Sequence, residues 1–347
     1  MTSYIFHKKQ HTRESNMELL RIASIIAIIY YHILVFVHNK SGEPIYQAMF
    51  LPLHVGVLLF VMISGYFHIK FSIKKLIMII GPMVVYSIPS ILSAISDEGY
   101  SFQIITNQLL FVSHSQYWYM RTYIGLFLLA PVINKYLDTC SNKNRIALIV
   151  CLLFIATWQG TTCGDPSLYA GKNIINFMLL YSIGDTFRRY NNLIKQIPIH
   201  KLILAYLLLN TLLVGTYAYF SELAIARIIY RLSYQYCSPI LLLNSILVFF
   251  IFMKISIMSA LINNIARSVL AIYLIHCNNV FFPTIVEPAI LRIFSEGSHF
   301  SNILGLFILT IAIFIICMII DRILTPIWIL TEKVSTIIER KLKIEYN

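Results

Sequence analysis

The first apolar segment of the chain, MELLRIASIIAIIYYHILVF, contains an arginine and a histidine, Arg21 and His32, that could do chemistry. A charged residue at the centre of a membrane helix costs about 2.5 to 3.5 kcal/mol on insertion scales, so such residues usually have a functional reason. The two residues are eleven apart, a spacing that turns an α-helix only about 20° past three full turns and climbs about 16 Å. Both side chains therefore share one face, where a histidine can move a proton. Helix contacts for His32 and interfacial anchoring for Arg21 are the structural alternatives.

Three further places combine polar residues with apolar surroundings. Tyr273 and His276 stand three apart in ARSVLAIYLIHCNNVFF, so they could offer a second polar stripe to the interior of a bundle. Arg121 falls inside the apolar segment that begins QYWYMRTYIG, where it could face a polar cavity. Lys74 and Lys75 follow a short basic turn. They could bind an anionic cofactor or simply fix the topology.

The elements that position these residues are expected to be membrane helices. The composition indicates this, because 58% of the 347 residues are hydrophobic and only 12% are charged. A spanning helix takes roughly 20 mostly apolar residues, and such stretches recur along the whole chain. The sequence predicts an all-α integral membrane protein, a bundle of about ten transmembrane helices. Their predicted ranges are 18–38, 50–69, 74–95, 117–136, 145–160, 172–187, 201–220, 237–253, 266–285 and 301–330. We predict a single membrane domain over residues 1–347, with tails at 1–16 and 331–347, and do not count the segment 102–112.

The basic residues predict the orientation of the bundle, since Lys and Arg accumulate in cytoplasmic loops. One set of alternating segments holds all but six of the 27 Lys and Arg residues. The opposite set holds Lys40, Arg121, Lys172, Arg227, Arg231 and Arg292. Both termini are therefore expected to be cytoplasmic. The net charge of +12 then fits a face that lies against anionic lipid, and it requires no nucleic acid.

Several kinds of chemistry lack their usual sequence patterns. The chain has no G-x-S-x-G elbow and no H-E-x-x-H pair, so we expect neither a serine hydrolase nor a metal site. Its six cysteines show no C-x-x-C spacing and are expected to be packing residues. The polar N-terminal residues lead into a full apolar span, which is not the pattern of a cleavable signal peptide.

The chain resembles the acyltransferase 3 family, membrane-bound enzymes that O-acetylate surface polysaccharides, lipid-linked sugars and other acceptors. The likeness lies in the Arg21 and His32 pair, LFVMISGYF at 59–67, YWYMRTYIGLFLLAP at 117–131 and SVLAIYLIH at 268–276. These places span nearly the whole chain in the family's order, and ten helices is also the family's number. Many relatives carry Arg-x-x-Arg at the start of the third helix, where this chain has Lys74 and Lys75. Lysine can hold phosphate only as a point charge, without the bidentate fork of arginine.

The resemblance implies an O-acetyltransferase in a bacterial cytoplasmic (inner) membrane. Its acyl donor would be acetyl-CoA and its acceptor a glycan or glycolipid, and Arg21 and His32 would be the residues most tied to activity. Arg21, Lys74 and Lys75 are then expected to bind the phosphates of the donor. His32 is expected to take the proton from the attacking hydroxyl, or alternatively to carry the acyl group itself.

The same resemblance leaves two questions open. Attack on a thioester develops an oxyanion that needs a nearby donor or positive charge, and Arg121, Tyr273 and His276 are the candidates for that role or for binding the acceptor. The competing class is a transporter of glycans or lipid-linked sugars, because intramembrane His and Arg also line permeation paths. Paired Gly- or Pro-broken helices and inverted repeats, which point to transporters, are not visible in the sequence.

Overall fold

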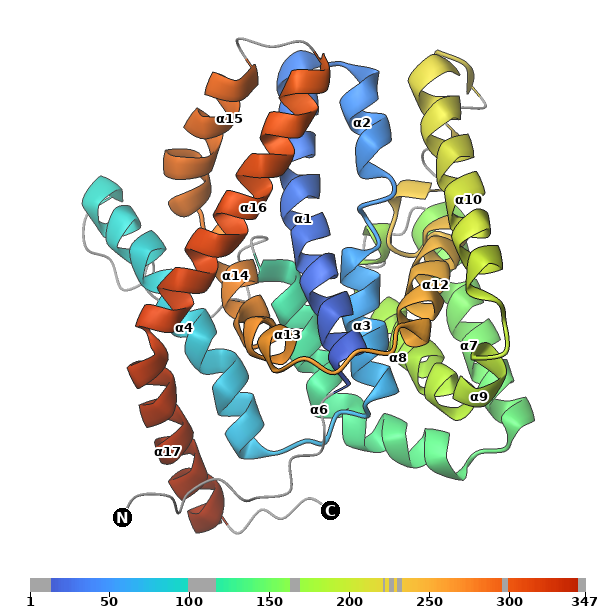
Figure 1. The fold of residues 1–347 in the computed structure, drawn as a ribbon. Coiled ribbons are helices and arrows are strands. Elements are labelled where there is room, and N and C mark those ends of the chain that lie inside the picture. The colour runs from blue at the N-terminus through green and yellow to red at the C-terminus, as the bar shows by residue number, and fades with distance from the viewer. Residues whose placement is uncertain are drawn as a thin grey trace.

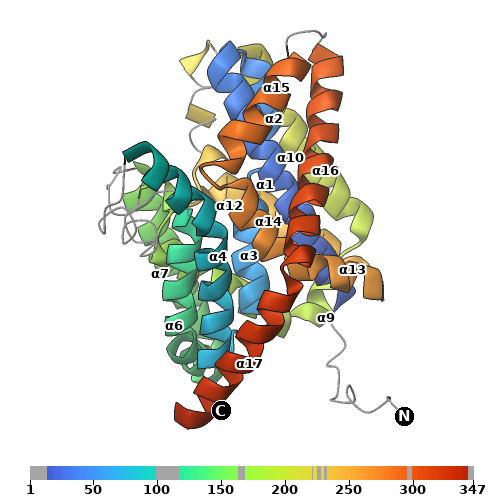
Figure 2. The same ribbon diagram turned by 90° about the vertical axis from the view of Figure 1, so that its left-hand side faces the viewer.

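The fold is all-helical over the residues that the computed structural model describes, which are 14–98, 117–162, 169–220, 222–224, 228–229, 233–294 and 299–342. No strand occurs within these ranges. The segment 102–112, left out of the predicted helix count, lies outside them. The bundle is drawn from two sides in Figures 1 and 2.

The helices follow the apolar segments of the sequence. In chain order they are α1 (Ser15–Ser41), α2 (Pro44–Phe50), α3 (Gly56–Tyr66), α4 (Ile73–Glu98), α6 (Trp118–Thr139), α7 (Asn142–Thr157), α8 (Ile174–Arg189), α9 (Asn191–Ile194), α10 (Ile199–Phe220), α12 (Pro239–Lys254), α13 (Ala260–Ile265), α14 (Val269–His276), α15 (Glu287–Phe294), α16 (His299–Ile323) and α17 (Thr325–Leu342). Among the residues that the structure describes, four helices are long and apolar enough to cross a membrane, namely α1, α4, α10 and α16. The count of ten spans and the cytoplasmic termini stay predictions.

Three predicted spans differ from the helices observed. The span at 50–69 is shorter, because α2 ends at Phe50 and α3 starts only at Gly56. The span at 266–285 is interrupted after His276, where α14 ends. The span at 301–330 is two helices, and residues 331–342, predicted as part of a tail, belong to α17. Pro326 explains the last break, since a proline has no N–H to continue α16 but is tolerated in the first turn of a new helix.

Helix α1 runs through the middle of the bundle and contacts α2, α3, α12, α13, α14 and α16. Helices α4 and α17 pack together on one side, and α10 packs against α12 on the other (Figure 1). The start of α1 and the end of α17 lie toward the same end of the molecule (Figure 1). Figure 2 shows α17 continuing below α16 along one side of the bundle. The central place of α1 puts Arg21 and His32 inside the protein.

Close packing of α3 on α8 depends on glycine. A Cβ added at Gly65 would overlap the backbone carbonyl of Tyr181, and one added at Gly184 would overlap the carbonyl of Met62. The two helices therefore touch through their backbones, as small residues allow in membranes. Phe67 and His68, which follow α3, are held at a fixed place beside α8 as a result.

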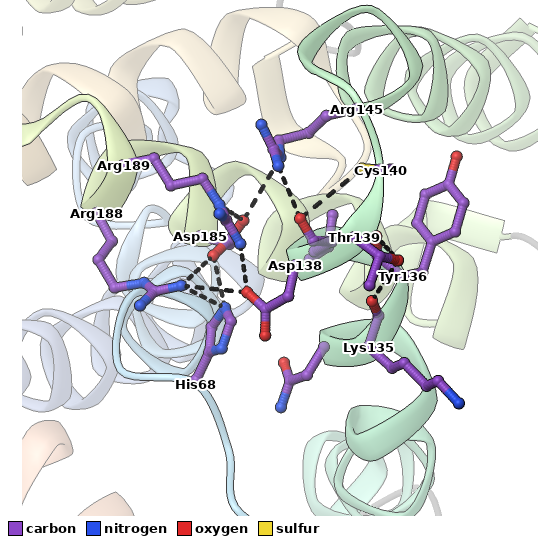
Figure 3. Close-up of polar contacts among 12 residues, drawn as sticks. His68, Lys135, Tyr136, Asp138, Thr139, Cys140, Arg145, Asp185, Arg188 and Arg189 are labelled. Atoms are coloured by element: carbon purple, nitrogen blue, oxygen red, sulfur yellow. Dashed lines mark hydrogen bonds and ion pairs between the residues drawn. The ribbon is translucent and has the colours of Figure 1, made fainter.

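A buried ion cluster joins the ends of α3, α6, α7 and α8 (Figure 3). The carboxylate of Asp185 is fully buried and accepts hydrogen bonds from His68 Nε2 at 2.5 Å, Arg188 at 2.9 Å and Arg189 at 2.7 Å. Arg145 Nε lies 3.8 Å from the same carboxylate. Asp185 thus faces three arginines, of which Arg145 is buried, while Arg188 and Arg189 are partly exposed and also pair with Asp138. Its buried charge links the four helix ends.

Replacing Asp185 with asparagine is expected to destabilise the protein by roughly 1 to 3 kcal/mol, because Arg145 loses its nearby buried carboxylate while Arg188 and Arg189 keep Asp138. The measurement is the midpoint of thermal unfolding of purified protein in detergent. Asp138→Asn is the matched control, since Asp138 pairs with Arg189 but its side chain is 53% exposed. Equal shifts in the two variants would contradict a special role for the buried carboxylate.

Candidate active site

Two histidines from distant parts of the chain meet inside the bundle. His32 of α1 and His276, the last residue of α14, place Nδ1 and Nε2 3.2 Å apart across 244 residues of sequence. Their rings stack with centroids 5.2 Å apart and planes inclined by 28°. His276 is buried, and His32 is partly exposed to a cavity. The sequence singled out both residues but did not predict that they touch.

The hydrogen bonds around this pair assign its protons. His276 Nδ1 lies 2.8 Å from the carbonyl oxygen of Ile272, which can only accept, so Nδ1 carries the hydrogen. The neutral ring then has its lone pair on Nε2, where it can accept the Nδ1–H of His32. With His32 rather than the Cys277 thiol as the donor to His276 Nε2, the lone pair of His32 is on Nε2. An imidazole held in this tautomer is ready to act as a base.

A cavity of about 410 Å³ reaches the histidine pair, and we call it the histidine cavity. Its walls come from α1 and from the stretch where α14 ends. The lining residues are His32, His276, Cys277, Asn278, Asn279, Phe282 and Pro283. A polar molecule in this cavity would lie against His32, which is the more exposed residue of the pair.

A second cavity, of about 260 Å³, lies nearer the N-terminal ends of α1 and α14, and we call it the arginine cavity. Arg21 of α1 and Arg267, just before α14, are its two cations. Tyr273 also lines it, and the Tyr273 ring lies 6.0 Å from the His276 ring. The remaining lining residues are Ile28, Val57, Phe60, Ser64, Ile79, Tyr119, Met120, Tyr123, Ala266, Val269 and Leu270. Both cavities thus border the histidine pair. The histidine cavity is lined by the two rings themselves, and the arginine cavity reaches His276 through Tyr273.

The guanidinium of Arg21 already has partners within the protein. It forms an ion pair with Glu18, with distances of 2.9 Å and 3.0 Å to the two carboxylate oxygens. It also lies over the ring of Phe67, 5.8 Å from the ring centre. These contacts aim the side chain into the arginine cavity. Because Glu18 offsets part of the charge, a bound anion would need further positive charge, which Arg267 can supply.

The predicted lysines and Arg121 lie elsewhere. Lys74 Nζ pairs with Glu332 of α17 at 2.7 Å, and Lys75 Nζ donates to the carbonyl oxygen of Lys70 at 2.9 Å. Arg121 is exposed near the start of α6. None of the three is among the described residues that line either cavity. Their predicted roles stay predictions, with no support from the cavity geometry.

Sequence reasoning missed residues at both cavities. Arg267 counted only as a topological charge, although its position just before SVLAIYLIH placed it close to Tyr273 and His276. Cys277 counted as a packing residue, yet its Sγ lies 3.3 Å from His276 Nε2 and 3.8 Å from His32 Nδ1. Its place directly after His276 was the available signal.

His54 belongs to an aromatic cluster beside His32. Its ring stacks on Tyr31 with centroids 4.6 Å apart and contacts Tyr234 and Tyr236. The hydroxyls of Tyr31 and Tyr234 lie 2.9 Å apart. His54 is 4% exposed, and neither of its ring nitrogens has a hydrogen-bond partner among the described residues. Buried polar atoms of this kind call for a water or a ligand.

These observations define a class of protein, a helical membrane protein whose polar chemistry lies inside the bundle and between two cavities. A family model described as an acyltransferase domain, Acyl_transf_3, matches residues 14–322. The chain therefore belongs to the acyltransferase 3 family, and it is a membrane acyltransferase. Comparison with curated proteins and with solved structures gives no match. The matched range includes both histidines and both arginines of the site.

Proposed function

We propose that the protein transfers an acetyl group from acetyl-CoA to a hydroxyl of a cell-surface polysaccharide or lipid-linked sugar, in a bacterial cytoplasmic membrane. The observation that carries this proposal is the contact between His32 and His276, which both line the histidine cavity, with Tyr273 of the arginine cavity against the His276 ring. In an acyltransferase, this arrangement would give the acyl donor one cavity and the acceptor the other.

The donor binds at the arginine cavity. Arg21 and Arg267 provide forked donors that suit phosphate oxygens, and such charge-assisted hydrogen bonds are the strong ones. The cavity is lined mostly by apolar side chains beyond its two arginines, which suits the pantetheine arm better than a nucleotide. The nucleotide of CoA therefore stays at the mouth, and its thioester arm enters toward Tyr273.

His32 acts as the general base on a hydroxyl that enters through the histidine cavity. As the acceptor oxygen attacks the thioester carbonyl, its proton passes to His32 Nε2. The C–S bond then breaks, the acetyl group stays on the acceptor oxygen as an ester, and the CoA thiolate takes the proton back from His32. This route transfers the acetyl group directly and needs no covalent acyl-enzyme intermediate.

Two neighbouring groups support the reacting atoms. The hydroxyl of Tyr273 is the proposed donor to the developing oxyanion, because Tyr273 lines the arginine cavity next to the His276 ring. The unpartnered nitrogens of His54, in the aromatic cluster beside His32, are proposed to receive acceptor hydroxyls.

The experiment that tests this function uses membranes that contain the protein and membranes that lack it. Both receive radiolabelled acetyl-CoA, with unlabelled longer acyl-CoA as competitor, in a host verified to make the glycan acceptor. We expect label in the extracted glycan or glycolipid only with the protein present, and we expect mild base to release it as an ester. Absence of label in both preparations, or glycan movement without acyl transfer, would reject the proposal.

Arg267→Gln is expected to raise the KM for acetyl-CoA about 10- to 150-fold, because a hydrogen bond to a charged group contributes roughly 1.5 to 3 kcal/mol. The measurement is the initial transfer rate across a range of acetyl-CoA concentrations. Lys74→Gln is the comparison, since Lys74 pairs with Glu332 away from the cavity. A larger change in KM for Lys74→Gln than for Arg267→Gln would move the donor site to the lysines.

A further inference from the structure

We propose that His32, His276 and Cys277 form a binding site for Zn²⁺, and that the bound ion switches the general base off. The ligand atoms are His32 Nδ1, His276 Nε2 and Cys277 Sγ, which all lie within 4.8 Å of one another. The site itself rests only on the geometry, and the inhibition rests in addition on the proposed function.

The distances among the three atoms fit a tetrahedral ion. They are 3.2 Å between the two nitrogens, 3.3 Å between Sγ and His276 Nε2, and 3.8 Å between Sγ and His32 Nδ1. With Zn–N bonds of about 2.0 to 2.1 Å and Zn–S bonds of about 2.3 Å, tetrahedral ligands stand about 3.3 to 3.6 Å apart. The observed distances lie within about 0.2 Å of this range. Small shifts of the side chains would therefore bring all three atoms to bonding distance of one ion.

The surroundings of His276 are those of a metal ligand. A coordinating histidine usually donates its other ring N–H to a carboxylate or backbone carbonyl, which fixes the tautomer and the ring orientation. His276 does this through Nδ1 and the carbonyl oxygen of Ile272, at 2.8 Å. Its Nε2 lone pair is thus held toward His32 and Cys277 before any ion arrives.

The fourth position of the ion faces the histidine cavity. All three ligands line that cavity, which gives the ion a path in and room for a bound water. Two nitrogens, one sulfur and an open position form a set that Zn²⁺ accepts. Binding breaks the S–H bond of Cys277 and releases that proton to water, while the thiolate sulfur bonds to the metal.

The ion would stop catalysis through the tautomer of His32. A neutral imidazole that coordinates through Nδ1 carries its hydrogen on Nε2. His32 Nε2 then has no lone pair for the acceptor proton. The sequence pointed to no metal because the ligands come from α1 and from the end of α14, a pairing that no spacing along one helix displays.

The direct test uses Co²⁺ as a spectroscopic probe of the purified full-length protein in detergent. We expect the wild type to bind Co²⁺ with tetrahedral bands and a thiolate-to-cobalt charge-transfer band that Zn²⁺ displaces. Cys277→Ser is expected to lose the charge-transfer band. Cys151→Ser, which changes an exposed cysteine of α7, is expected to keep it. No band in the wild type, or a band that persists in Cys277→Ser, overturns the proposal.

A measurement on the wild type alone guards against a variant that fails to fold. X-ray absorption at the zinc edge of protein loaded with one equivalent is expected to show one sulfur neighbour and three nitrogen or oxygen neighbours, from the two histidines and the bound water. A shell of oxygen and nitrogen only overturns the site.

The inhibition is tested separately, by titrating Zn²⁺ into the transfer assay and scaling each protein to its own metal-free rate. The half-inhibiting concentration is expected to be at least 10-fold higher for Cys277→Ser than for the wild type. Equal concentrations overturn the inhibition. If the metal-free wild type transfers no acetyl group, the proposed function fails while the spectra still decide the metal site.

Discussion

Replacing His32 with alanine is expected to lower kcat for acetyl transfer by roughly 10²- to 10⁴-fold, the usual contribution of a general base. The KM for acetyl-CoA should stay near its wild-type value, because His32 lines the histidine cavity while the donor is proposed to bind at the arginine cavity. A change confined to kcat marks a group that acts in the transition state.

The measurement is the initial rate at varied acetyl-CoA, in membranes with matched amounts of each protein. His200→Ala is the control, because His200 is exposed at the start of α10. Unchanged kcat in His32→Ala, or an equal loss in His200→Ala, would remove His32 from the chemistry.

His276→Ala is expected to cost nearly as much, roughly 10²- to 10³-fold in kcat, because His32 loses the acceptor that holds its tautomer. His276 is a positioning residue, since it acts through His32. His276→Gln should recover part of the rate, because the side-chain carbonyl of glutamine can accept the same Nδ1–H.

The comparison between the two His276 variants separates positioning from structure. Both remove the contact with the Ile272 carbonyl, so a purely structural role predicts similar losses of stability and rate in the two. Positioning predicts that only glutamine restores kcat, with the KM for acetyl-CoA unchanged in both variants. Equal rates for alanine and glutamine would contradict the assigned tautomer.

Local features of this fold could be predicted from the sequence. Long apolar runs predict the positions of α1, α4, α10 and α16, because a helix that crosses the hydrocarbon layer needs about 20 mostly apolar residues. The shared face of Arg21 and His32 follows from helix geometry alone. The family resemblance, carried by motifs from the first helix to the ninth, is confirmed by the family match.

Features that depend on tertiary packing could not be predicted. The contact between His32 and His276 joins residues 244 apart and follows from the way α14 lies against α1. The ion pair between Lys74 and Glu332 of α17 likewise joins distant residues, and no local pattern in the sequence predicts it. The apolar character of 301–330 also hides the break at Pro326, since hydropathy does not register a missing N–H.

The most direct test of the central claim is a single-turnover assay with purified protein reconstituted into vesicles together with the acceptor. Radiolabelled acetyl-CoA is added to wild type and to His32→Ala, and the label is measured as base-labile ester on the acceptor. We predict that the wild type forms the ester within one turnover, and that His32→Ala forms essentially none although it binds the donor equally well. Equal ester formation by both proteins would contradict the account.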